Sequence, residues 1–277
     1  MDPIGQSQLL FSPCRVSIAP MSHLLALSSG SLIGFSLGLI GGGGSILAVP
    51  LLLYVVGMRS PHLAIGTSAF AVAVNAFIGL LGHWRAGTVK WPCATVFALS
   101  GIAGAAAGST LGKMIDGQQL LFLFALVMIA VGIAMLRRRD AGGNPAAHMN
   151  AAMAPRLVAV GFLAGCISGF FGIGGGFLIV PGIMLGSGMP MINAIGSSLF
   201  SVSLFGLTTS ANYAFSHLVD WPVAAELIAG GAAGSWAGMK LARRLAEDRK
   251  ILTRIFAGVV FGVAAYMLFR TGAGWLR

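Results

Sequence analysis

Residues 38–50 read GLIGGGGSILAVP, and residues 169–181 read GFFGIGGGFLIVP. At an offset of 131 residues the two stretches share four glycines and a closing Leu-x-Val-Pro. After a one-residue deletion the match continues at an offset of 130, through Ala-Ile-Gly at 64–66 and 194–196. The sequence therefore predicts two equivalent halves, each with one glycine-rich break in an apolar stretch.

The composition is that of a membrane protein. Of the 277 residues, 57% are hydrophobic and 9% are charged, whereas a soluble domain carries about 25% charged residues. Uncharged apolar stretches such as 62–82, 92–111 and 119–136 are long enough to cross a hydrocarbon core of about 30 Å as helices. Because backbone groups in a bilayer must be paired within the segment, and strand-like alternation is absent, we predict an all-α polytopic membrane protein.

We expect about ten membrane segments, five in each half. They are 22–40, 46–57, 62–82, 92–111, 119–136, 157–171, 177–188, 193–213, 222–241 and 252–270. The second segment of each half is short, because twelve helical residues rise only about 18 Å. The expected organisation is a flexible tail (1–21), a first repeat (22–139), a linker (140–155) and a second repeat (156–277).

The orientation of the halves depends on these short segments. If each dips into the membrane and returns beside a full first span, a half has four crossings and the halves are parallel. If it crosses completely, or if the first two segments form one re-entrant hairpin, a half has five or three crossings and the halves are inverted.

Charge favours an odd number of crossings. Four crossings divide the 17 lysines and arginines 9 to 8, whereas either odd number places twelve on one face and five on the other. The uneven split is what the positive-inside rule expects. We therefore predict inverted repeats with both termini outside the cytoplasm, and we attribute the net charge of +10 to topology rather than to nucleic-acid binding.

Pro50 and Pro181 mark two predicted helix breaks. Proline is tolerated in the first turn of a helix and not deep inside one. The helices after the glycines are therefore expected to begin near Val49 and Val180. The segments expected to be unwound are 41–48 and 172–179.

Unwound backbone at membrane depth must bond to protein, water or a ligand. Free amides at the start of a helix, where the helix dipole is positive, form an anion-binding site, and inverted symmetry is expected to bring the two breaks together near the midplane. The predicted substrate-binding residues are Gly41, Gly42, Gly43, Gly44, Ser45, Gly172, Gly174, Gly175 and Gly176. The alternative, close helix packing, is favoured for Gly34, Gly38, Gly101, Gly104, Gly108, Gly165 and Gly169.

Polar residues inside the apolar spans are the other candidates. They are Thr67, Ser68, Ser197, Ser198, Asn75 and Asn212. The Thr/Ser pairs occupy equivalent places in the two halves and are either anion ligands or bonds between helices. The asparagines are possible polar ligands but are not equivalent to each other, and bonding between helices is favoured for them.

Ionisable residues are scarce inside the spans. Glu226 is the one acidic residue within a predicted span, and a helix-start or water-exposed role is favoured over proton transport. No metal-ligand cluster and no nucleophile–base pair lies in the spans. We therefore expect no metal, no cofactor and no enzymatic activity.

The two glycine stretches, with AIGTS at 64–68 and AIGSS at 194–198, make the chain resemble the TauE/SafE (TSUP) family of sulfite-exporting membrane permeases. The resemblance covers about residues 22–270. It implies transport of a small sulfur-containing anion, such as sulfite, thiosulfate, sulfoacetate or another sulfonate. It also implies coupling to protons and a location in the bacterial inner membrane. A passive channel for small anions is the alternative.

Overall fold

The computed structural model describes residues 20–137, 153–172, 176–189, 191–244, 258 and 260–270. These residues form helices joined by turns, and no strand occurs among them. The elements are α1 (Pro20–Ile40), the 3-10 helix η1 (Gly41–Leu47), α2 (Ala48–Tyr54), α3 (Pro61–Arg85), α4 (Trp91–Met114), α5 (Gly117–Arg137), α6 (Ala154–Phe171), α7 (Gly176–Ser187), α8 (Met191–Ala214) and α9 (Trp221–Arg244). An apolar C-terminal helix (Val260–Arg270) follows them.

The prediction of an all-α polytopic membrane protein is confirmed. Four of the described helices are long and apolar enough to cross a membrane: α3, α4, α6 and the Asn193–Ala214 part of α8. Most of the predicted tail and linker lies outside the described residues, but α1 begins at Pro20 and α6 at Ala154, so the last residues of both segments are helical.

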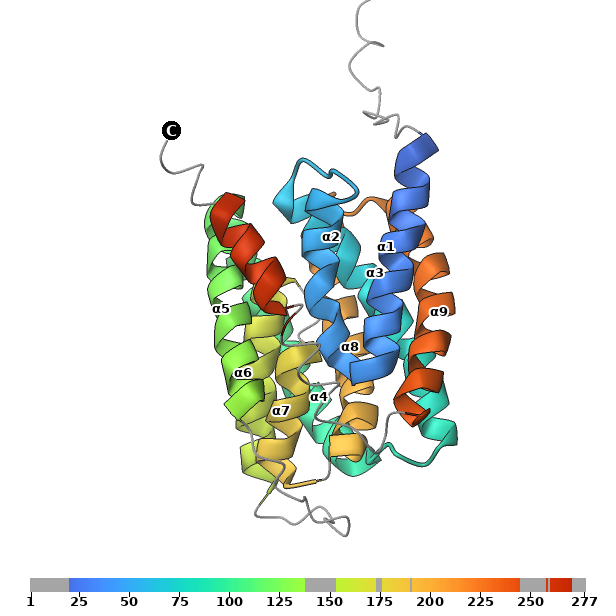
Figure 1. Ribbon diagram of the computed structural model, residues 1–277. Coiled ribbons are helices and arrows are strands. Elements are labelled where there is room, and N and C mark those ends of the chain that lie inside the picture. Colours follow the sequence, from blue (N-terminus) through green and yellow to red (C-terminus); the bar gives the residue numbers. More distant parts are fainter. Residues whose placement is uncertain are drawn as a thin grey trace, which may run out of the picture.

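The path of the chain shows in which direction the short second segment of each half runs. In Figure 1, α1 runs downward from the top of the bundle, and η1 and α2 return beside it to the same end. The helices α6 and α7 form the corresponding hairpin from the bottom. We call these two ends the α1 end and the α6 end. Each half therefore begins with a hairpin whose two arms reach the same end of the bundle, as both odd-crossing alternatives expect; which of the two applies stays a prediction.

The halves pack through equivalent pairs of helices. The helix α1 packs on α9, α6 packs on α4, and α3 and α8 pack on each other. A Cβ added at Gly34 would lie 2.0 Å from the carbonyl oxygen of Gly231, and one at Gly165 would lie 2.1 Å from that of Gly101. Close packing was expected at Gly34, Gly38, Gly101, Gly104, Gly108, Gly165 and Gly169, and these contacts confirm it.

Basic residues gather at the α6 end. The described lysines and arginines there are Arg85, Lys90, Arg137, Arg156, Lys240, Arg243 and Arg244. Those at the α1 end are Arg59, Lys113 and Arg270. The uneven distribution predicted from the sequence is therefore present in the described part of the fold.

Candidate anion site

The first glycine turn is the 3-10 segment η1, Gly41–Leu47, which is followed by α2 at Ala48. The prediction that a helix begins near Val49 is confirmed to within one residue, but the segment expected to be unwound is a 3-10 helix, which is wound more tightly than an α-helix. Gly44 lies against the backbone of α1, because an added Cβ would be 2.2 Å from the nitrogen of Leu37. Ser45, the residue after the four glycines, is buried.

The second glycine turn is different. The helix α6 ends at Gly172, whose φ of +66° suits glycine and whose N–H donates to the carbonyl of Gly169. The next helix, α7, begins at Gly176 and contains Pro181.

The prediction that this helix begins near Val180 is therefore wrong. Pro181 is the sixth residue of α7, so its missing N–H frees only the carbonyl of Phe177, in the first turn. Because α7 begins at Gly176, Ile179 lies within the helix, where it is fully buried in the core. The predicted ligands Gly174 and Gly175 lie outside the described residues.

The two turns lie on opposite sides of the middle of the bundle. Gly172 contacts Ile65, one turn after α3 begins at the α1 end. Gly38, just before the first turn, lies against Ser235 and Met239, close to where α9 ends at the α6 end. The hairpins touch, because η1 packs against α7; that the two glycine breaks face each other near the membrane midplane stays a prediction.

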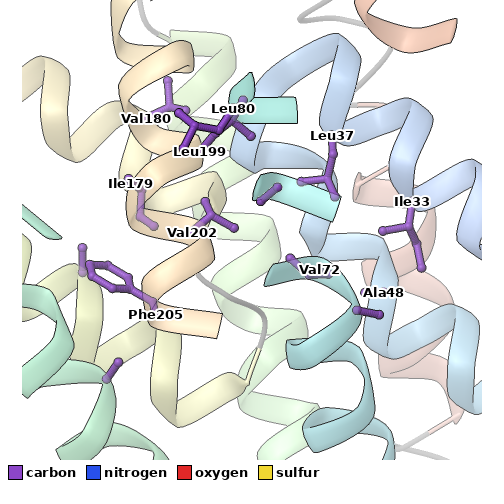
Figure 2. Close-up of a cluster of buried hydrophobic side chains, with 14 of the residues drawn as sticks. Ile33, Leu37, Ala48, Val72, Leu80, Ile179, Val180, Leu199, Val202 and Phe205 are labelled. Carbon is purple, nitrogen blue, oxygen red and sulfur yellow. The ribbon is translucent and has the colours of Figure 1, made fainter. Parts of the chain in front are cut away.

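Apolar side chains fill the space between the hairpins. Figure 2 shows Ala48 and Val72 beside each other, and Ile179 and Val202 on the facing helices α7 and α8. All four belong to one buried cluster. The described parts of the two glycine turns are therefore separated by an apolar centre.

The first hydroxyl of each Thr/Ser pair accepts a hydrogen bond from the residue that precedes a helix of the other half. Thr67 Oγ1 accepts a hydrogen bond from the N–H of Asp220 at 2.9 Å, just before α9. Ser197 Oγ accepts one from the N–H of Lys90 at 3.0 Å, just before α4. These two bonds are equivalent under the duplication. In both bonds the hydroxyl oxygen acts as the acceptor.

The second hydroxyl of each pair donates within its own helix. Ser68 Oγ donates to the carbonyl of Ile65 at 3.0 Å, and Ser198 Oγ donates to that of Ile195 at 2.8 Å. Ser68 shares the face of α3 that touches Gly172 through Ile65. Ser198 lies on α8, which packs against η1. Each glycine turn therefore has one buried serine on the neighbouring helix.

The two asparagines bond between helices. Asn75 Nδ2 donates to the carbonyl of Leu227 on α9 at 3.2 Å. Asn212 Nδ2 donates to Ser109 Oγ at 2.6 Å and to Thr110 Oγ1 at 2.9 Å on α4. Bonding between helices is the interpretation that the sequence favours for both asparagines. Within the described residues, Asn75 Oδ1 is buried and has no donor.

The family of the chain can be established by comparison. The family model described as "Sulfite exporter TauE/SafE" matches residues 26–267. The chain belongs to the TauE/SafE family. A "Probable membrane transporter protein" of Xylella fastidiosa (strain 9a5c) is 51% identical to this TauE/SafE chain over 253 residues, covering 91% of the chain and 97% of that relative. "Probable membrane transporter protein YunE" of Bacillus subtilis (strain 168) is 26% identical, with coverage of 84% and 91%. No solved structure matches the chain.

Sequence reasoning missed one polar cluster of this TauE/SafE protein. Lys113 Nζ donates to both the side-chain and the main-chain oxygen of Asn212, at 2.7 and 3.0 Å, and to Ser216 Oγ at 3.0 Å. It therefore joins the end of α4 to the end of α8. In the sequence Lys113 looks like a topology determinant, and only the helix pairing reveals its partners.

Proposed function

We propose that this TauE/SafE protein is a secondary transporter, not an enzyme, that moves a small sulfur-containing anion across the bacterial inner membrane. Sulfite, thiosulfate, sulfoacetate and other sulfonates form the proposed substrate class. The observation that carries the proposal is the pair of hairpins, each turning through glycines beside a buried serine. The family and the names of the relatives support a membrane transporter.

The chemistry of the turns suits a singly or doubly charged oxyanion. Main-chain N–H groups and hydroxyls bind an anion without a fixed positive charge, so the anion can also leave. Sulfite and sulfonates offer several oxygens that accept such bonds. Among the described residues no cluster of three His, Cys, Asp or Glu could hold a metal, and the proposed binding does not need one.

The two separated turns suit alternating access. An anion at the second turn, beside Gly172 and Ser68, would be near the α1 end. An anion at the first turn, beside Ser198, would be near the α6 end. We infer that the hairpins shift against α3 and α8, so that the apolar centre separates the anion from one side or the other, and that proton binding drives the cycle.

Substitution of the glycines tests the site. We predict that Gly43→Val and Gly175→Val abolish transport of labelled sulfite and thiosulfate in liposomes, because a side chain displaces the anion from the main-chain donors. Gly262→Val is the matched control, since nothing lies within 4 Å of a Cβ added there. All three variants should reach the membrane in equal amounts. Wild-type transport by both turn variants would refute the proposed site.

Binding to the purified protein identifies the substrate. A thermal-shift screen with sulfite, thiosulfate, sulfoacetate, taurine, sulfate and phosphate should show stabilisation by one or more of the first three. Gly43→Val and Gly175→Val should remove the shift. Stabilisation by phosphate alone would refute the proposed substrate class.

A passive anion channel is the second candidate. It uses the same hairpins but needs no switching between two closed states. The direction of flux in the presence of a pH gradient distinguishes it from a transporter.

A further inference from the structure

A contact between a histidine and a carboxylate joins α1 to α9 near the α1 end. His23 Nδ1 lies within hydrogen-bonding distance of Glu226 Oε1. On α9 the following turns carry Gly230 and Gly234, whose added Cβ atoms would lie 2.1 Å from the Leu27 carbonyl and 2.0 Å from the Ser31 carbonyl. Glu226 and His23 therefore continue the close contact of α1 with α9 by one more turn, toward the α1 end.

The surroundings of Glu226 are suited to binding and releasing a proton. Its side chain is only 21% exposed, whereas that of His23 is 47% exposed. Glu226 Oε2 is buried and has no partner among the described residues. An ionised carboxylate with one unpaired oxygen is costly inside a membrane, and a proton removes the charge. His23 meanwhile connects the carboxylate to water.

The other described ionisable groups lie farther along the helices. On α1, the partner is His23. On α9, Asp220 precedes the first turn and accepts from the N–H of Val223, while Lys240, Arg243 and Arg244 are at the far end. On α3, His62 is in the first turn, and His83 and Arg85 are in the last. Protonation of Glu226 therefore changes chiefly its interaction with His23.

A direct bond connects this part of α9 to the helix that carries the candidate serine. Leu227, the residue after Glu226, presents its carbonyl both to Asn75 Nδ2 on α3 and to Gly30 on α1. A shift of α9 against α1 would therefore be transmitted through Asn75 to α3. The helix α3 holds Thr67 and Ser68.

The equivalent contact of α6 with α4 has no counterpart of this arrangement. Under the duplication Glu226 corresponds to Val96, His23 to Ala154 and Asn75 to Phe205. The equivalent helix pairs pack alike, because Phe205 lies against Gly101 as Asn75 lies against Gly231. The titratable pair is thus an addition to one of two otherwise matched helix contacts.

We propose that Glu226 is the binding site of the coupling proton and that His23 is its partner. This inference rests on the proposed transporter. One proton from water at the α1 end adds to the Glu226 carboxylate and gives a neutral acid. The negative charge that attracts a protonated His23 is then lost, and α9 can shift against α1. Release of the same proton restores the pair.

Exchange and gradient-driven uptake separate this role from others. We expect Glu226→Gln, in full-length protein in liposomes, to keep exchange of labelled thiosulfate within about twofold. It should lose the accumulation that a gradient of one pH unit drives in the wild type, which is at most about tenfold for each coupled proton. Glu226→Asp should restore part of that accumulation. Asp116→Asn, an exposed carboxylate that bonds the N–H of Gln118, is the control and should accumulate like the wild type.

Infrared difference spectra between low and high pH test proton binding without any substrate. The wild type should show the C=O stretch of a protonated carboxyl group, and Glu226→Gln should lose it while Asp116→Asn keeps it.

Several results would overturn the inference. Wild-type accumulation by Glu226→Gln, or an unchanged carboxyl band, would show that the proton binds elsewhere while the transporter stands. Loss of exchange together with accumulation would make Glu226 a structural or substrate residue. Exchange by the wild type with no response to pH would show that transport is not coupled to protons, and the inference would fall with that coupling.

Discussion

Glycine residues have two different roles in this chain. In the contacts of α1 with α9 and of α6 with α4, glycine removes a side chain so that two backbones can touch. At Gly172 it also permits a left-handed conformation with φ of +66°. The pairs Gly34–Gly231 and Gly165–Gly101 show the first role in both halves.

The packing role predicts a stability defect. In Gly34→Ala the new Cβ would lie 2.0 Å from the carbonyl oxygen of Gly231, so α1 must move away from α9. We expect a loss of about 1–3 kcal/mol, the usual cost of overpacking, seen as a lower unfolding temperature in detergent. Gly262→Ala, with nothing within 4 Å, should unfold like the wild type. Equal unfolding temperatures for the two variants would contradict the proposed packing.

At the level of the elements, the sequence predicted the helices well and their ends less well. Apolar runs located α3, α4 and α9, because hydrophobicity is a local property of the sequence. The start of α7 was wrong because burial of Ile179 and its neighbours outweighs one lost hydrogen bond near Pro181.

The depth of the glycine turns also depends on tertiary packing. Whether Gly172 faces the midplane or the α1 end is decided by its contact with Ile65, far away in the sequence. The roles of Thr67 and Ser197 as supports for α9 and α4 could not be predicted for the same reason.

Substitution of Lys113 tests how much its hydrogen bonds between α4 and the end of α8 stabilise the protein. Lys113→Met removes three hydrogen bonds to oxygens of Asn212 and Ser216. We expect the free energy of unfolding to fall by about 1–3 kcal/mol, because polar oxygens lose their donors. Thermal unfolding in detergent measures the effect. Arg59→Met, a change at an exposed cation of the same end, should have little effect, and a loss equal to that of Lys113→Met would argue against a specific join.

At the scale of the whole molecule, the charge distribution predicts the orientation. Most described basic residues are at the α6 end, which we therefore assign to the cytoplasm. The described chain begins and ends at the opposite end.

Labelling of single cysteines tests this orientation. With the native cysteines replaced by serine, Ala86→Cys at the α6 end should react with an impermeant maleimide only in inverted vesicles. Arg59→Cys at the α1 end should react in intact cells. Both positions are exposed. The opposite pattern would reverse the assigned orientation and would place the termini in the cytoplasm.

Uptake of labelled thiosulfate into liposomes, with the membrane voltage held near zero and a pH gradient imposed, tests most directly whether the two glycine turns serve a transporter. The wild type should accumulate thiosulfate above its external concentration while the gradient lasts, and Gly43→Val should not. Thiosulfate flux that always runs down its own gradient, whatever the pH difference, would contradict a coupled transporter and identify a channel.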